Sequence, residues 1–233
     1  MKVAIVIPVY NHEQRIVEVI RQALKLVLPL IVVDDGSTDR TPELIGNIQG
    51  ISVIRHPVNM GKGAALLTGF AAAVEQGCDW AITMDGDGQH RPEDARTLLQ
   101  AVADGRRVIV VGRREGMVGK NVPWTSRFGR GFSNFWVWAA GGPLISDSQS
   151  GFRLYPLPEA LHLGVKARRY QFEVEVLVRA RRRGIETIEA PIQVVYQTRG
   201  ERVSHFQPWL DFRRNSATFS RLIWERIFGA SRK

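Results

Sequence analysis

The sequence of 233 residues contains a single cysteine, Cys78, so no disulfide can form within one chain. A fold held together by disulfides is excluded, and a reducing, cytoplasmic location is expected. No run of residues reaches the ~18 apolar positions that a membrane-spanning helix needs. The longest candidate, residues 132–145, is interrupted by polar residues, glycines and a proline. The apolar N-terminus ends at Pro8 and is too short for a signal sequence, so none is expected.

Two common phosphate-binding fingerprints are also missing from the sequence. There is no Walker A loop, and no Gly-x-Gly-x-x-Gly follows the first predicted strand. Positive charge is plentiful, because the formal net charge is +9. This balance favours an anionic partner such as a nucleotide phosphate, a nucleic acid or an acidic membrane surface. The positive charge alone would permit a nucleic acid as the partner. No nucleic-acid recognition motif is found, however, so this partner is not expected.

Predicted strands and helices alternate through the first half of the chain. Short apolar runs predict strands at residues 3–7, 30–33, 51–54, 80–84 and 108–111. Helical patterns lie between them, at residues 16–27, 63–75 and 92–103, and a further short helix is expected after Thr41-Pro42-Glu43. This alternation is typical of an α/β domain with a doubly wound, mostly parallel sheet and helices on both faces. In the second half we expect helices near residues 126–140, 170–182 and 208–228, and a strand near 186–190.

Two of the predicted strands end in acidic turns. Asp34 and Asp35 follow one strand, and Asp85 and Asp87 follow another, with a glycine after each of the latter two. Ligands of such sheets bind at the carboxyl ends of the strands. Two carboxylates spaced i, i+2 can hold a hard divalent cation and leave positions for phosphate. Taken alone, the turn at Asp85 and Asp87 is better explained as an ordinary connection between a strand and a helix, and the turn at Asp34 and Asp35 is explained equally well in that way.

Five motifs favour the ligand-binding interpretation by their joint order. They are Ile7-Pro8-Val9-Tyr10-Asn11, residues 32–39, Gly61-Lys62-Gly63, Asp85-Gly86-Asp87-Gly88-Gln89-His90, and Asp147-Ser148-Gln149-Ser150-Gly151-Phe152-Arg153. In this order they resemble the inverting family-two glycosyltransferases of GT-A fold, and most closely the dolichol- or polyprenyl-phosphate mannose and glucose synthases. The resemblance implies a catalytic domain at residues 1–206, divided into a nucleotide-sugar half at 1–112 and an acceptor half at 113–206. A basic amphipathic helix at 207–233 would follow.

The resemblance also implies the donor site. Asp85 and Asp87 match the Asp-x-Asp motif that binds Mg²⁺ or Mn²⁺ at the diphosphate, and Gln89 matches a residue beside that metal. A metal and an arginine would stabilise the negative charge that develops on the leaving phosphate, and Arg199 matches such a contact. The residues implied to hold the nucleotide-sugar are Pro8, Tyr10, Glu13, Asp35, Lys62, Asp85, Gln89 and Arg113.

On the acceptor side the resemblance singles out Asp147. This residue is either a general base or a group that only positions the acceptor. A phosphate acceptor is already anionic and needs little deprotonation, whereas a hydroxyl acceptor would need a base. Glu173 and Glu175 are within reach of the active-site rim, and at least one of them is expected on a solvated helix face. The expected acceptor contacts are Arg127, Arg130, Ser150, Arg153, Ser204 and His205.

The expected function is transfer of a hexose from a GDP- or UDP-linked sugar to a polyprenyl or dolichyl phosphate at the cytoplasmic face of the membrane. The alternatives are a hydroxyl acceptor on a lipid, polyene or envelope glycan, a basic nucleic-acid-binding protein, and an inactive scaffold. The helical segment 208–228 predicts peripheral contact with an anionic membrane, or packing on the catalytic domain or a partner. Homo-oligomer formation is left open. The basic residues in or near this segment are Arg213, Arg214, Arg221, Arg226, Arg232 and Lys233.

Overall fold

A mixed seven-stranded sheet forms the centre of the protein. The computed structural model describes residues 1–115, 124–193 and 208–228, with side chains left out at 124–129 and 208–213. The sheet order is β3-β2-β1-β4-β6-β5-β7. The strands are β1 (Val3–Val9), β2 (Leu30–Asp34), β3 (Ser52–Arg55), β4 (Trp80–Thr83), β5 (Ile109–Arg114), β6 (Arg153–Pro156) and β7 (Thr187–Ile192).

All neighbouring strands are parallel except β6, which lies antiparallel between β4 and β5. The chain builds outward from β1 through β2 to β3, then crosses to the other side of β1 to form β4. The strand order therefore reverses between β1 and β4. In open α/β sheets, ligands bind outside the carboxyl ends of the strands at such a reversal. Asp85 follows β4 at this place.

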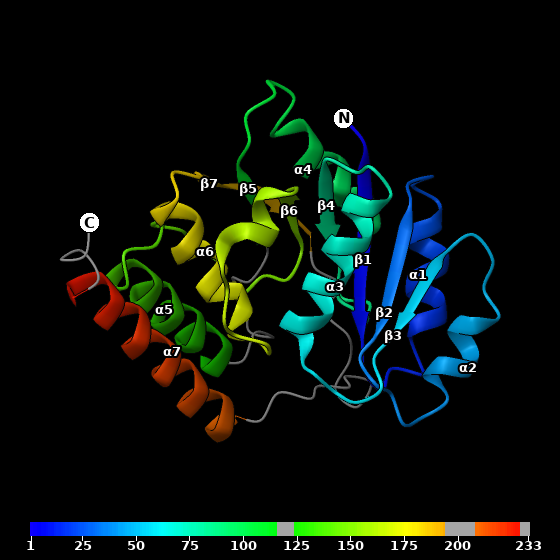
Figure 1. Ribbon diagram of the computed structural model, residues 1–233, viewed down its shortest axis with the longest axis horizontal. Coiled ribbons are helices and arrows are strands. Elements are labelled where there is room, and N and C mark those ends of the chain that lie inside the picture. The colour runs from blue at the N-terminus through cyan, green and yellow to red at the C-terminus, as the bar shows by residue number, and fades with distance from the viewer. Residues whose placement is uncertain (116–123, 194–207, 229–233) are drawn as a thin grey trace.

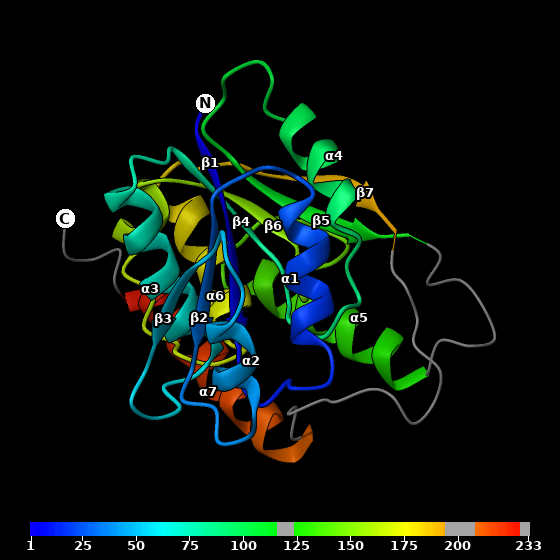
Figure 2. The ribbon, with the colours of Figure 1, turned by 90° about the vertical axis from the view of Figure 1, so that its right-hand side faces the viewer.

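Helices cover both faces of the sheet (Figure 1, Figure 2). Along β1, Ala4 and Val6 belong to one core and Ile5 and Ile7 to the other, as expected for a strand buried on both faces. The core of Ile5 and Ile7 includes α1 (Ile16–Leu24), α2 (Thr41–Gly46) and α4 (Ala95–Gln100), which a short 3₁₀ turn at Pro92–Asp94 precedes. The core of Val6 includes α3 (Lys62–Glu75), α5 (Trp124–Ala139), α6 (Phe172–Arg182) and α7 (Pro208–Phe228), with a 3₁₀ turn at Glu159–Leu163.

Three local expectations differ from the structure. Helix α1 stops at Leu24, and Val27 is 89% exposed with a positive φ, so the apolar spacing to 27 overran the helix. The helix expected at 92–103 is regular only over α4, because its first turn is 3₁₀. Strand β6 was not expected. Its four residues, Arg153–Pro156, begin with a charge and end in proline, so they carry no alternating pattern.

Helix α7 packs on the domain through one face and exposes another. Phe219 and Leu222 are buried, and the Phe219 ring stacks on Trp136 of α5. Arg221 turns inward and donates to Glu175 of α6 (2.7 Å), which is a packing contact on the catalytic domain, one of the two alternatives that the sequence left for this helix. Trp224 is 64% exposed on the other side of the helix. Across the described ranges, no helix combines the length and apolar character that crossing a membrane requires.

Gly69, in the middle of α3, sets the distance between this helix and the sheet. A Cβ at Gly69 would lie 2.3 Å from Cγ1 of Val6 in β1. We expect Gly69→Ala to lower the free energy of unfolding by about 1–3 kcal/mol, because the buried valine leaves no room. Urea denaturation would measure this. Gly46→Ala in α2 is the matched control, since its Cβ would meet nothing within 4 Å. Equal effects of the two substitutions would contradict the interpretation.

Candidate active site

The buried carboxylate of Asp35 organises the loop that leads into α3. Its Oδ1 atom accepts hydrogen bonds from His56 Nδ1 (2.8 Å) and the Met60 amide (2.9 Å), and its Oδ2 atom accepts one from the Gly61 amide (2.7 Å). These bonds hold the turn immediately before Lys62. The carboxylate at the end of β2 thus positions a lysine beside the end of β4. A contact between Asp35 and a base or ribose stays a prediction.

Lys62 lies between two carboxylates that come from distant parts of the chain. Its Nζ atom is 2.6 Å from Asp85 Oδ1 and 2.5 Å from Glu173 Oε1. Burial alone would lower the pKa of Lys62, but the charges of Asp85 and Glu173 outweigh it and raise the pKa above its ordinary value. Burial alone would raise the pKa of Asp85, but the charges and hydrogen bonds of Lys62 and His90 together outweigh it and hold the pKa well below its ordinary value. The ion pair is therefore fully charged near neutral pH.

Close backbone approach brings the second half of the chain to this pair. A Cβ at Gly63 would lie 2.6 Å from Cβ of Phe172, so glycine lets α6 pack against the start of α3. This packing is how Glu173 reaches Lys62. A Cβ at Gly151 would lie 2.5 Å from Asp85 Oδ2 and 2.8 Å from Lys62 Nζ. The loop before β6 therefore passes directly over the ion pair, and the absence of a side chain at Gly151 allows this close approach.

His90 completes the surroundings of Asp85 and was given no role from the sequence. Its Nε2 atom is 3.5 Å from Asp85 Oδ2, and its ring stacks on Phe152 at 5.2 Å. Its place at the end of the Asp-Gly-Asp-Gly-Gln-His motif was the available signal. In the same turn, Asp87 Oδ1 accepts a hydrogen bond from the Gln89 amide (3.0 Å), which ties Gln89 to the second carboxylate.

Asp147 is fully buried in a paired arrangement with Arg114. The Arg114 guanidinium donates two hydrogen bonds to the carboxylate, one from Nε to Oδ2 (2.7 Å) and one from an amino nitrogen to Oδ1 (2.7 Å). Glu189 Oε1 accepts hydrogen bonds from the amides of Ser146 (3.0 Å) and Asp147 (3.1 Å). A carboxylate engaged in this way orients the loop that carries it. The geometry therefore favours a positioning role of Asp147 over that of a general base.

The comparison with known families agrees with this geometry. The sequence model of "Glycosyl transferase family 2" matches residues 4–157. The chain belongs to glycosyltransferase family 2. A UDP-N-acetylglucosamine–dolichyl-phosphate N-acetylglucosaminyltransferase of Methanococcus voltae is 31% identical over 82% of this chain and 85% of its own length. The polyprenol monophosphomannose synthase of Mycolicibacterium smegmatis is 31% identical over 81% of this chain and 75% of its own. An undecaprenyl-phosphate mannosyltransferase of Micrococcus luteus is 30% identical over 86% of each.

Solved structures support the GT-A fold of this family 2 chain. Mannosyl-3-phosphoglycerate synthase from Rubrobacter xylanophilus superposes with a TM-score of 0.66 at 18% identity, covering 100% of this chain and 76% of that one. The complex of S. aureus TarS with UDP gives a TM-score of 0.55 at 17% identity, covering 96% and 66%. At these identities the likeness concerns the fold. The expected doubly wound, mostly parallel sheet is confirmed.

The structure of this family 2 enzyme separates the neighbouring arginines of β5. Arg113 was singled out from the sequence, but its side chain pairs with Glu115 (3.2 Å) at the surface. Arg114, one residue later, points to the opposite side of the strand and holds Asp147. A phosphate contact of Arg113 stays a prediction, whereas Arg114 is a site residue that the sequence did not single out.

The predicted acceptor residues fall into three groups. Ser150 and Arg153 are fully buried, and Arg153 donates to the carbonyls of Ser150 (2.6 Å), Ser148 (2.7 Å) and Glu173 (2.7 Å). Arg153 thereby holds the acceptor-side motif together and presents no group to solvent. Arg130 lies partly exposed on α5. The Arg127 side chain, Arg199, Ser204 and His205 lie outside the described residues.

The prediction of a solvated face for Glu173 or Glu175 was wrong. Both side chains are buried, at 7% and 0% exposure of the residue. Glu173 contacts Lys62, and Glu175 accepts from Arg179 Nε (2.5 Å) and Arg221 (2.7 Å). The two buried glutamates of α6 thus have different contacts: Glu173 pairs with Lys62 beside Asp85, and Glu175 holds Arg221 of α7.

Proposed function

We propose that this family 2 enzyme transfers a hexose from a GDP- or UDP-linked sugar to a polyprenyl or dolichyl phosphate. The main support is the cluster of Asp85, Lys62 and Glu173. It lies where the strand order reverses between β1 and β4, beneath the loop that contains Gly151. The relatives named for dolichyl-, polyprenol- or undecaprenyl-phosphate sugar transfer support the acceptor class. We propose residues 1–206 as the catalytic domain, divided at 112, with α7 attached to it through Arg221.

A divalent cation, Mg²⁺ or Mn²⁺, fits the residues at the end of β4. Asp85 and Glu173 bring two carboxylates against the one ammonium group of Lys62, Asp87 follows two residues after Asp85 in the same turn, and Gly151 carries no Cβ that would crowd Asp85. Within the described residues, no group of three or more His, Cys, Asp or Glu side chains could hold a metal alone. Mg²⁺ commonly uses only one or two carboxylates together with substrate phosphates. We therefore propose that Asp85 and Asp87 hold the cation jointly with the donor diphosphate, with Gln89 beside them.

The reaction forms a bond between an acceptor phosphate oxygen and the anomeric carbon, and it breaks the bond from that carbon to the nucleoside diphosphate. The bound cation would stabilise the charge that develops on the leaving diphosphate. Lys62, held by Asp85 and Glu173, adds a fixed positive charge at the same place. Asp147 and Arg114 hold the acceptor-side loop. An anionic phosphate nucleophile suits this site, because Asp147 is already engaged and a hydroxyl would need a free base.

We place the enzyme at the cytoplasmic face of the membrane, in peripheral contact with it. The acceptor class is a membrane lipid, and the single cysteine suits a reducing compartment. Exposed aromatic side chains on α5 and α7, including Trp138 and Trp224, support a peripheral contact.

Metal-dependent nucleotide binding should depend on Asp87. We expect Asp87→Asn to weaken binding of GDP or UDP in the presence of Mn²⁺ at least tenfold, because one carboxylate ligand is lost. Isothermal titration calorimetry with and without Mn²⁺ measures this. Asp104→Asn is the matched control, since Asp104 lies at the surface beside Arg106. The proposal fails if neither nucleotide binds in a Mn²⁺-dependent way, or if Asp87→Asn binds as the wild type does.

A further inference from the structure

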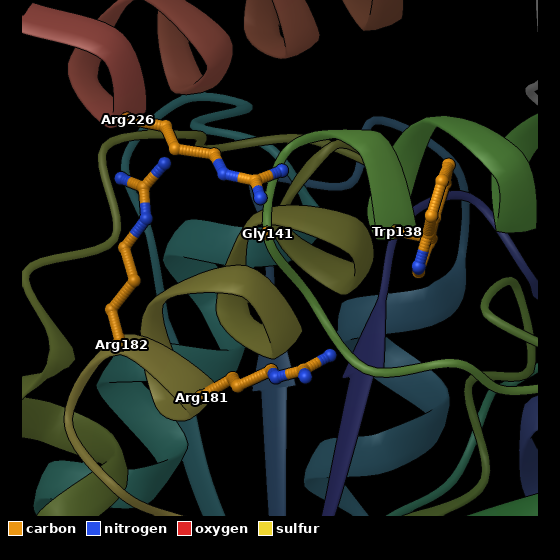
Figure 3. A pocket seen from close by; sticks show the side chains of 5 residues that line it. All are labelled: Trp138, Gly141, Arg181, Arg182 and Arg226. Atoms are coloured by element: carbon orange, nitrogen blue, oxygen red, sulfur yellow. The ribbon is translucent and has the colours of Figure 1, made fainter.

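A cavity of about 320 Å³ lies where the C-terminal ends of α5, α6 and α7 meet. It is lined by Trp138, Gly141, Arg181, Arg182 and Arg226 (Figure 3). In Figure 3 the side chains of Arg182 and Arg226, from two different helices, lie near one another, the guanidinium group of Arg226 points toward Gly141, and Trp138 lies on the other side of the loop that carries Gly141. This cavity belongs to no part of the donor site described above.

The three arginines are held in place by backbone carbonyls at the end of α5. Arg226 donates to Ala139 O (2.7 Å), Arg182 to Ala140 O (3.2 Å), and Arg181 to Gly142 O. Such contacts satisfy carbonyls that a helix end leaves open. Each guanidinium carries five N–H donors, so these bonds leave further donors on every one of them. The groups are thereby oriented in advance without being used up.

Positive charge exceeds negative charge around the cavity. Arg182 forms an ion pair with Glu225 (3.1 Å), and Glu225 also forms an ion pair with Arg179 (3.3 Å). For Arg181 and Arg226, no carboxylate of the described residues lies within ion-pair distance. Fixed guanidinium groups with spare donors are suited to the oxygens of a phosphate.

Exposed apolar side chains lie on the same helix ends that form the cavity, and Trp138 lines it directly. Of the eleven large hydrophobic residues that are exposed in the described part of the chain, six lie on or next to the C-terminal ends of α5 and α7. The two helix ends are neighbours, because Arg226 bonds to Ala139 and Trp136 stacks on Phe219. Tryptophan and phenylalanine beside arginine are typical of a surface that lies in a membrane interface. The six residues are Phe135, Trp138, Leu144, Trp224, Ile227 and Phe228.

From these observations we propose that the cavity binds the phosphate head group of an anionic bilayer phospholipid, while the surrounding apolar side chains enter the interface. The site is distinct from the acceptor phosphate site, and it would fix the orientation of the domain on the membrane. The inference deepens the proposed membrane contact, but it rests on the geometry of the cavity and not on sugar transfer.

Vesicle flotation without donor or acceptor tests the site separately from catalysis. The vesicles are phosphatidylcholine with or without phosphatidylglycerol. The test variant is Arg181→Gln/Arg226→Gln, and the control is Arg40→Gln/Arg106→Gln, which removes the same charge from exposed positions elsewhere. At about 1 kcal/mol for each basic residue near an anionic surface, we expect roughly thirtyfold weaker binding to phosphatidylglycerol vesicles for the test variant and less than a twofold change for the control.

A second variant guards against a loss of fold in the arginine variant. Trp224→Ser/Ile227→Ser changes only exposed side chains of α7 and should also weaken vesicle binding, with an unchanged melting temperature. Equal losses in the two arginine variants would show diffuse charge attraction and overturn the site. Absence of wild-type binding to phosphatidylglycerol vesicles would overturn it too, even where the enzyme transfers sugar in detergent. If the protein binds the vesicles through these arginines but transfers no sugar, the phosphate site is supported and the proposed function is contradicted.

Discussion

Replacing Gly151 by alanine is expected to lower the rate of sugar transfer by about two to three orders of magnitude while the protein stays folded. The added Cβ would lie 2.5 Å from Asp85 Oδ2 and 2.8 Å from Lys62 Nζ. Both atoms stand at the ends of flexible side chains, so they can move away without disturbing the sheet. Their movement would break the ion pair and fill the space proposed for the cation and the diphosphate.

Initial rates with a saturating donor, together with circular dichroism, would measure both parts of this prediction. Gly131→Ala in α5 is the matched control, because a Cβ there would meet nothing within 4 Å. A Gly151→Ala enzyme of nearly wild-type rate would show that the space over Asp85 and Lys62 takes no part in the reaction. A variant that fails to fold would contradict the argument that only side-chain ends are displaced.

Of the substitutions considered, Glu175→Ala should lower the free energy of unfolding most, by about 3 kcal/mol. The carboxylate is fully buried and accepts four hydrogen bonds, from Arg179 Nε (2.5 Å), Arg221 (2.7 Å) and the amides of Lys166 (3.1 Å) and Ala167 (2.8 Å). Its removal leaves these donors without their acceptor and removes one of the contacts that hold α7 on α6. Urea denaturation gives the value, and Glu186→Ala at an exposed position is the control.

The same residue predicts a dependence of stability on pH. Burial raises the pKa of Glu175, but the hydrogen bonds from Arg179, Lys166, Arg221 and Ala167 outweigh it and bring the pKa below the ordinary value of 4.5. A carboxyl group whose pKa is lower in the folded state stabilises fully above its unfolded pKa, and this contribution is lost as the pH falls through the folded value. Below pH 4.5 the wild type should therefore lose more stability than Glu175→Ala. Parallel stability curves would contradict this.

The first half of the fold follows from the sequence because its strands are continuous apolar runs and its glycines and prolines mark the turns. The place of Asp85 and Asp87 follows as well, since the carboxyl ends of parallel strands share one edge. Strand β6 does not follow, because the register of Thr83 with Arg153 joins residues seventy positions apart.

The contacts between the two halves of the chain could not be predicted from the sequence either. Glu173 meets Lys62 across 111 positions of sequence, and no local pattern distinguishes a glutamate that points to a lysine from one that points to water. The contact of Arg114 with Asp147 was not predicted for a similar reason, because the two residues lie 33 positions apart in the sequence. Adjacent residues of a strand face opposite sides, so the prediction for Arg113 gives no information on its neighbour.

The most direct test of the central claim is mass spectrometry of the lipid product. The purified chain is incubated with polyprenyl phosphate, Mg²⁺ or Mn²⁺, and each of a panel of GDP- and UDP-linked sugars. We expect at least one donor to give a product whose mass is that of polyprenyl phosphate plus one hexose residue. The Asp87→Asn variant should not form this product. Folded wild-type protein that gives no such product with any donor, or an Asp87→Asn variant that forms it as readily, would contradict the account.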